Sequence, residues 1–134
     1  MNITYKDIVG AFGRFLLALL FLLSGFSKLT DPTGTIAYIA SSGLPFPTLS
    51  YAAALFVEIL LALFLVIGFK TKITALLMAV FAFITAIMFH KPLSDPNQFI
   101  HFFKNISIAG GMLQLFVFGG GSLSVDKCLK NRKR

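Results

Sequence analysis

Long apolar stretches alternate with short polar connections along the chain. Four of these stretches are long enough, or nearly so, to cross a bilayer as a helix, which takes about 20 residues. They cover residues 8–29, 49–69, 73–89 and 99–118. The pattern therefore predicts an all-α integral membrane protein, in which an antiparallel four-helix bundle forms a single domain over residues 1–126.

The connections predict how the helices follow one another. Residues 70–72 form a very short connection between the second and third stretches, so these two helices are expected to be antiparallel neighbours. Residues 91–97 contain two prolines and predict a turn. The longer first connection, residues 30–50, opens with the helix-start signal of Asp31 and Pro32. Apolar residues at helical spacing follow, which predicts a short interfacial helix between spans one and two.

The composition agrees with a membrane protein. Hydrophobic residues make up 57% of the chain and charged residues 13%, whereas a soluble domain carries roughly 25% charged residues. The net charge of +7 does not indicate nucleic-acid binding, because the basic residues lie between and after the apolar stretches. With Cys128 as the single cysteine, the chain cannot form an intramolecular disulfide.

Lys and Arg residues predict the orientation of the spans, because they are in excess on the cytoplasmic side. If both termini lie on one side, nine of the 12 basic residues lie there with them: Lys6, Arg14, Lys70, Lys72, Lys127, Lys130, Arg132, Lys133 and Arg134. Both termini are therefore expected in the cytoplasm, and residues 127–134 are expected to form a basic cytoplasmic tail.

Ionisable residues inside the spans are the first candidates for function, since such residues are costly in a membrane and usually face the bundle interior. Arg14 and Glu58 lie at depths that an arginine side chain can bridge, so we expect a structural ion pair between them. The alternatives of a functional and a purely packing role for this pair stay open.

A second group of polar residues is expected in the outer half of the bundle. His101, Lys104 and Asn105 are spaced i, i+3 and i+4, so they share one face of the fourth helix. Lys28 and His90 lie at a similar depth, with Glu58 below them. These six residues are the candidate binding pocket: Lys28, Glu58, His90, His101, Lys104 and Asn105. The alternatives are lipid-headgroup contact for Lys28 and a plain interfacial turn for His90.

The motifs of several other chemistries are absent from the sequence. There is no Cys-x-x-Cys, His-Glu-x-x-His, phosphate loop or Gly-x-Gly-x-x-Gly. We therefore expect no metal or nucleotide, and nothing else supports a haem between the two histidines. The catalytic residues, if the protein is an enzyme at all, stay unknown at this point.

A set of short motifs, in order along the chain, resembles the DoxX family of bacterial membrane proteins. The resemblance covers roughly residues 7–126 and is carried by Gly13 and Arg14, residues 24–29, residues 42–45, Glu58, residues 68–71, Phe89 and His90, residues 98–105, Gly110 and Gly111, and Gly121, Ser122, Ser124 and Asp126. It implies a four-helix protein of the bacterial inner membrane.

The resemblance also implies candidate functions. Some members of the family are linked to electron transfer as quinone-reacting subunits of larger oxidoreductases, and many have no assigned activity. A quinone needs an apolar slot and hydrogen-bond donors at its carbonyls, which the candidate pocket offers. The expectation is therefore a quinone-interacting subunit with an oxidoreductase partner. The alternatives are a non-enzymatic structural or partner-binding subunit in the lipid bilayer, and a small transporter, which would need to form a homo-oligomer.

Overall fold

The computed structural model describes residues 2–90 and 93–134, and every regular element in them is helical. In chain order the elements are α1 (Tyr5–Thr30), α2 (Pro32–Ser41), α3 (Pro47–Leu55), the π-helix η1 (Phe56–Leu61), α4 (Ala62–Ile67), α5 (Thr71–Phe89), α6 (Pro96–Phe118) and α7 (Val125–Arg132). The predicted all-α class is confirmed. Two residues of the predicted turn at 91–97, residues 91 and 92, lie outside the described residues.

Four helices are long and apolar enough to cross a membrane. They are Tyr5–Thr30, the continuous segment Pro47–Ile67 built from α3, η1 and α4, then Thr71–Phe89 and Pro96–Phe118. Each predicted span lies within or overlaps one of them. The fourth is longer than its apolar pattern suggests, because Asp95 accepts a hydrogen bond from the Asn97 N–H and Pro96 opens the first turn.

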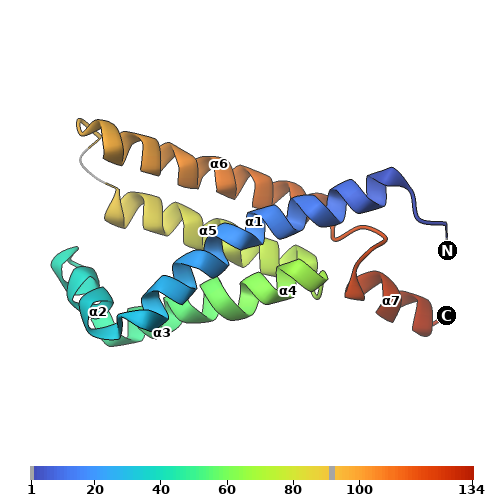
Figure 1. Cartoon of the computed structure of the whole chain (residues 1–134), viewed down its shortest axis with the longest axis horizontal. Coiled ribbons are helices and arrows are strands. Elements are labelled where there is room, and N and C mark those ends of the chain that lie inside the picture. The colour runs from blue at the N-terminus through green and yellow to red at the C-terminus, as the bar shows by residue number, and fades with distance from the viewer. Residues whose placement is uncertain (1, 91–92) are drawn as a thin grey trace.

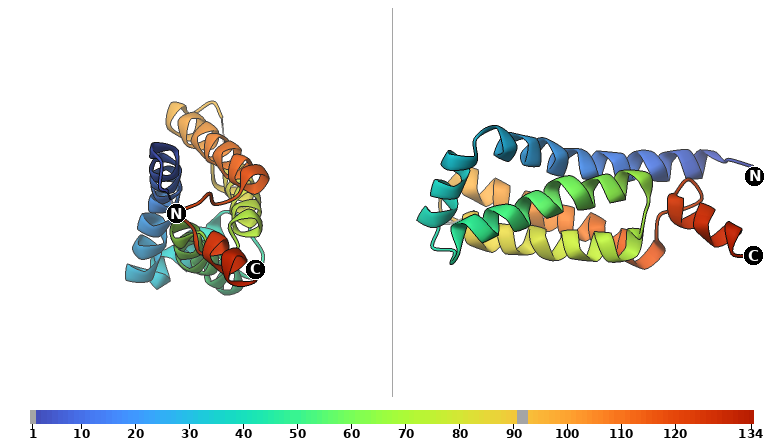
Figure 2. Two further views of the ribbon diagram at one scale, coloured as in Figure 1. Left: turned by 90° about the vertical axis from the view of Figure 1, so that its right-hand side faces the viewer. Right: turned by 90° about the horizontal axis from the view of Figure 1, so that it is seen from below.

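Consecutive long helices run in opposite directions (Figure 1). Helices α5 and α6 pack together along much of their length, and α1 packs on α4 and η1. The chain termini lie at one end of the molecule and α2 lies at the other (Figure 2). A short helix thus does follow the first span, and its position at a membrane surface stays a prediction.

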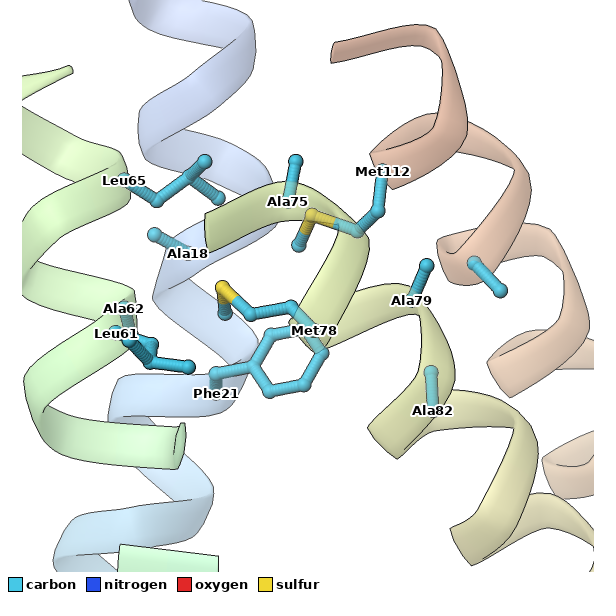
Figure 3. Close-up of a cluster of buried hydrophobic side chains, with 11 residues drawn as sticks. Ala18, Phe21, Leu61, Ala62, Leu65, Ala75, Met78, Ala79, Ala82 and Met112 are labelled. Carbon is cyan, nitrogen blue, oxygen red and sulfur yellow. The ribbon is translucent and has the colours of Figure 1, made fainter. Parts of the chain in front are cut away.

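The core is built from small and flexible side chains. It contains Ala18, Phe21, Leu61, Ala62, Leu65, Ala75, Met78, Ala79, Ala82, Ala109 and Met112 (Figure 3). Alanines let the helix backbones approach closely, and methionines fill the irregular gaps that remain. Large apolar residues such as Leu23, Ile84 and Val117 are exposed instead. This distribution is typical of helices whose outer faces contact lipid.

The C-terminal residues are more ordered than the sequence suggests. The sequence predicts only a basic tail at residues 127–134, whereas the structure forms a helix, α7, over Val125–Arg132. Ser124 caps this helix by accepting a hydrogen bond from the Lys127 N–H. Asp126 in the first turn and basic residues in the last turn complement the helix dipole.

Candidate functional site

A pocket of about 730 Å³ opens among α1, α2, α3, η1, α5 and α6. All six residues of the predicted pocket line it: Lys28, Glu58, His90, His101, Lys104 and Asn105. Its walls are largely apolar, and they include the rings of Phe21, Tyr38, Phe81 and Phe89. The residues that the sequence groups only by depth and helical spacing therefore do meet in space.

Glu58 lies at the inner side of this pocket and is only 5% exposed. Lys28 Nζ lies 3.1 Å from its Oε1, to which it donates a hydrogen bond, and 3.0 Å from its Oε2. Ser24 Oγ donates to Oε1 over 3.0 Å and accepts from Lys28 Nζ over 2.9 Å. The buried carboxylate is thus compensated by a cation and a hydroxyl, while Oε2 accepts no hydrogen bond from the described residues.

The close approach of α1 and η1 makes this network possible. At Gly25 an added Cβ would lie 2.6 Å from Ile59 Cδ1 and 3.0 Å from Glu58 Cβ, so a larger residue would push η1 away. The π-helical turn that carries Glu58 also has wider spacing than an α-helix, which changes the direction in which its side chains point. π-Helical turns are frequent at functional sites.

The backbone of Lys28 is also fixed by a hydrogen bond, in addition to the contacts of its side chain. The Tyr51 hydroxyl donates a hydrogen bond of 2.9 Å to the Lys28 carbonyl oxygen, which ties the end of α1 to α3. The Lys28 side chain is 25% exposed, against 6% for Glu58. The ammonium group is therefore within reach of a molecule that enters the pocket.

The opposite wall carries the histidine, lysine and asparagine side chains. His90 and His101 stack with their ring centroids 5.4 Å apart. Lys104 Nζ lies 3.1 Å from His101 Nδ1, and Asn105 Nδ2 donates to Thr85 Oγ1 over 3.1 Å. These residues line the pocket and carry N–H groups that can donate, which suits a ligand that accepts hydrogen bonds.

Three polar neighbours of the site are absent from the predicted set. Ser24 bridges Lys28 and Glu58, Thr85 holds Asn105, and the Gln98 side-chain oxygen lies 3.1 Å from His90 Nδ1. Helical spacing carries a signal for Ser24, four residues before Lys28, and for Gln98, three residues before His101. Nothing in the local sequence signals Thr85, because its contact depends on how α5 and α6 pack.

The predicted ion pair between Arg14 and Glu58 is wrong. Arg14 is 2% exposed, and its guanidinium donates to the carbonyl oxygens of Leu65 (2.9 Å), Val66 (3.2 Å) and Leu123. Leu65 and Val66 belong to the last turn of α4, where carbonyl groups carry partial negative charge, and the Leu65 carbonyl also accepts from the Gly68 N–H over 3.2 Å. Arg14 therefore caps α4, and Lys28 takes its place as the partner of Glu58.

The charged and polar side chains do not assemble a metal site in residues 2–90 and 93–134. No group of three or more His, Cys, Asp or Glu residues there could hold a metal ion. The pocket instead combines apolar walls with donors on two sides, Lys28 on one and His101, Lys104 and Asn105 on the other. Such a pocket can hold a flat, mostly apolar molecule that accepts hydrogen bonds at two ends.

The fold and the pocket together define a small helical membrane protein with four apolar helices and one polar cluster among them. The sequence pattern of the DoxX family matches residues 10–91, which is more than half of the chain, so the chain belongs to the DoxX family. It is 36% identical to the inner membrane protein YphA of Escherichia coli, over 91% of each chain. It is 33% identical to the inner membrane protein YqjF of the same bacterium, over 95% of this chain and 96% of that one. No solved structure matches.

Proposed function

We propose that this protein is an inner-membrane subunit that binds a quinone headgroup in the pocket beside Glu58. The observation that carries the proposal is the pocket itself, whose lining combines donors from α1 and from α6 with aromatic and aliphatic side chains. The two relatives named above are inner membrane proteins, which supports the same location for this chain.

The chemistry of a quinone fits the two walls. Its two carbonyl oxygens are hydrogen-bond acceptors at opposite ends of a flat ring. Lys28 serves one oxygen, and the Asn105 amide or the His101–Lys104 pair serves the other. Phe21 and Phe81, with ring centroids 6.4 Å apart, and the stacked rings of Tyr38 and Phe89 offer apolar surface to the ring.

Glu58 gives the pocket a group that can hold a proton. Conversion of a quinone to a quinol takes two electrons and two protons, and the electrons would come from an oxidoreductase partner in the membrane. Glu58 Oε2 accepts no hydrogen bond from the described residues, and Lys28 beside it reaches both the carboxylate and the pocket. In this proposal the Lys28 ammonium would give a proton to the reduced headgroup, and both protons that quinol formation consumes would come from water through the Lys28–Glu58 pair.

Titration of the purified protein in detergent with ubiquinone and menaquinone analogues tests this function. We expect saturable binding to the wild type, and His101→Ala and Asn105→Ala should each weaken it by about two- to tenfold, which is the effect of losing one hydrogen bond. Gln114→Ala is the matched control, because Gln114 lies on the same helix α6 and does not line the pocket. Gln114→Ala should unfold at nearly the wild-type temperature, whereas His101→Ala and Asn105→Ala should unfold slightly below it, because each loses one side-chain hydrogen bond.

A structural role for the polar cluster predicts the opposite result. The Lys28–Glu58–Ser24 network satisfies much of its own charge, so it is also suited to holding α1 against η1 without any ligand. In that case His101→Ala and Asn105→Ala would lower stability and the wild type would show no saturable quinone binding, alone or with its native partner. That outcome would end the quinone proposal and favour a non-enzymatic integrity subunit.

A further inference from the structure

A second pocket, of about 490 Å³, lies at the end of the molecule opposite α2. It is formed by the turn between α4 and α5, by residues 119–121 and by α7. Four lysines line it: Lys70, Lys72, Lys127 and Lys130. Because Lys70 precedes α5, Lys72 lies in its first turn and the other two lysines lie on α7, the cluster exists only in the folded chain.

Thr71 is a buried polar residue in the wall of this pocket. It is 0% exposed, and its Oγ1 has no hydrogen-bond partner among the described residues. The hydroxyl faces residues 119–121, since a Cβ added at Gly120 would lie 2.6 Å from Oγ1. A buried hydroxyl without a partner is unfavourable, so a small displacement of residues 119–121 that let a ligand oxygen reach it would be favoured.

The first turn of α5 adds positive character to the same place. Thr71 is the first residue of α5, and the backbone N–H groups of Lys72 and Ile73 in that turn have no intrahelical partner. Helix N-termini favour anions for this reason and because of the helix dipole.

One carboxylate lies among these groups and is already compensated. Asp126 accepts hydrogen bonds from the N–H groups of Lys70 (2.6 Å) and Thr71 (2.8 Å). The four lysine side chains form no ion pair with it within the described residues. The pocket therefore keeps an excess of positive charge that favours an anionic ligand.

We propose that this pocket binds the phosphate group of an anionic phospholipid. The site lies at the start of α5, which is one of the four helices long and apolar enough to cross a membrane, and the ends of such helices lie near the lipid headgroups. Ile73, which also lines the pocket, is 56% exposed, so an acyl chain can leave the pocket along the apolar face of α5. Basic pockets beside membrane helices recognise anionic headgroups in this way. The proposal is independent of the quinone proposal, because the two pockets share no residue.

Native mass spectrometry of the full chain in detergent tests the site with three probes. These are phosphatidylglycerol, a diacylglycerol with the same acyl chains and no phosphate, and inorganic phosphate. We expect phosphatidylglycerol to bind at least about tenfold more tightly than either of the others, since a lipid combines charged hydrogen bonds with apolar contact.

Two variants and a control locate the binding. Lys72→Gln and Thr71→Val should each weaken phosphatidylglycerol binding by about five- to tenfold, because each removes a donor to the phosphate. Thr71→Val should not lower the unfolding temperature in the absence of lipid, since the hydroxyl has no partner to lose. Arg132→Gln is the matched control, because Arg132 is a basic residue of α7 that does not line the pocket. Lys130→Gln, at an exposed position, replaces Thr71→Val if that variant fails to fold.

Two results would overturn the proposal. If Lys72→Gln and Lys130→Gln bound phosphatidylglycerol as tightly as the wild type and the Arg132→Gln control, the lipid would bind elsewhere. If inorganic phosphate bound as tightly as phosphatidylglycerol, the ligand would be a soluble phosphate and the lipid assignment would be wrong.

Discussion

Each end of the molecule buries one side chain that is ordinarily charged, and the two are stabilised in different ways. Near α2, Glu58 has a cation, Lys28, and a hydroxyl, Ser24, as partners. Near the termini, Arg14 is surrounded by the carbonyl oxygens of Leu65, Val66 and Leu123. The first arrangement borders a pocket of about 730 Å³, whereas the second fills the space between helices.

The end near the termini, where Arg14 is buried, is built for packing. Arg14 joins α1, the end of α4 and the segment before α7, and Leu123 lies 109 residues away in the sequence. Gly68 makes room for it, because a Cβ there would collide with the Ser124 side chain and would lie 2.5 Å from Arg14 Nη1. Gly68 also has φ of 73°, a left-handed conformation that favours glycine and ends α4.

The end near α2 is better suited to ligand chemistry. Lys28 is a quarter exposed and lines the pocket together with Glu58, so this ion pair can respond to a molecule in the pocket. Arg14 lines neither of the two pockets described above and is only 2% exposed. The comparison therefore assigns a mainly structural role to Arg14 and a candidate functional role to Glu58.

The largest expected effect is an all-or-none difference in labelling between the two ends. We expect both termini in the cytoplasm, so a cysteine introduced at the exposed Ser94 should react with an impermeant maleimide added to whole cells. Cys128, which is exposed on α7, should react only after the cells are lysed. Labelling of Cys128 in intact cells, with none at position 94, would place the quinone pocket on the cytoplasmic side.

The next largest effect is expected at Arg14. Arg14→Gln removes the guanidinium and its hydrogen bonds to the carbonyls of Val66 and Leu123, and each carbonyl left without a donor costs about 1–3 kcal/mol. The free energy of unfolding should therefore fall by about 3 kcal/mol. Chemical unfolding in detergent micelles measures this, with the exposed Arg132→Gln as a control that should change it by less than about 0.5 kcal/mol. A loss no larger than that of the control would show that Arg14 does not hold the helices together.

The smallest expected effect distinguishes the observed Lys28–Glu58 ion pair from the Arg14–Glu58 pair that the sequence predicts. In a double-mutant cycle, Lys28→Gln and Glu58→Gln should show a coupling energy of about 1 kcal/mol, because the two side chains are in direct contact. The cycle of Arg14→Gln with Glu58→Gln should be additive within about 0.5 kcal/mol, since these residues have no shared partner. If Arg14 and Glu58 were coupled and Lys28 and Glu58 were additive, Glu58 would pair with Arg14, as the sequence predicts.

The sequence by itself determined the four apolar helices, because a stretch of about 20 mostly apolar residues is the length that a helix needs to cross the hydrocarbon core. It also determined the His101–Asn105 face, because residues at i, i+3 and i+4 are neighbours on any α-helix, whatever surrounds it. Depth along the helices was enough to place Lys28 and Glu58 in the same pocket as this face.

Only the tertiary structure decided which charges meet. Depth does not specify how helices rotate and tilt against one another, and the π-helical turn at Glu58 further changes the direction of that side chain. The sequence pattern therefore predicted an ion pair between Arg14 and Glu58. In the fold Glu58 pairs with Lys28 instead, and Arg14 donates hydrogen bonds to the last carbonyls of α4. The lysine pocket beside Thr71 also arises from tertiary structure, because it requires the C-terminal helix to return to the start of α5, a contact made through Asp126 over 55 residues of sequence.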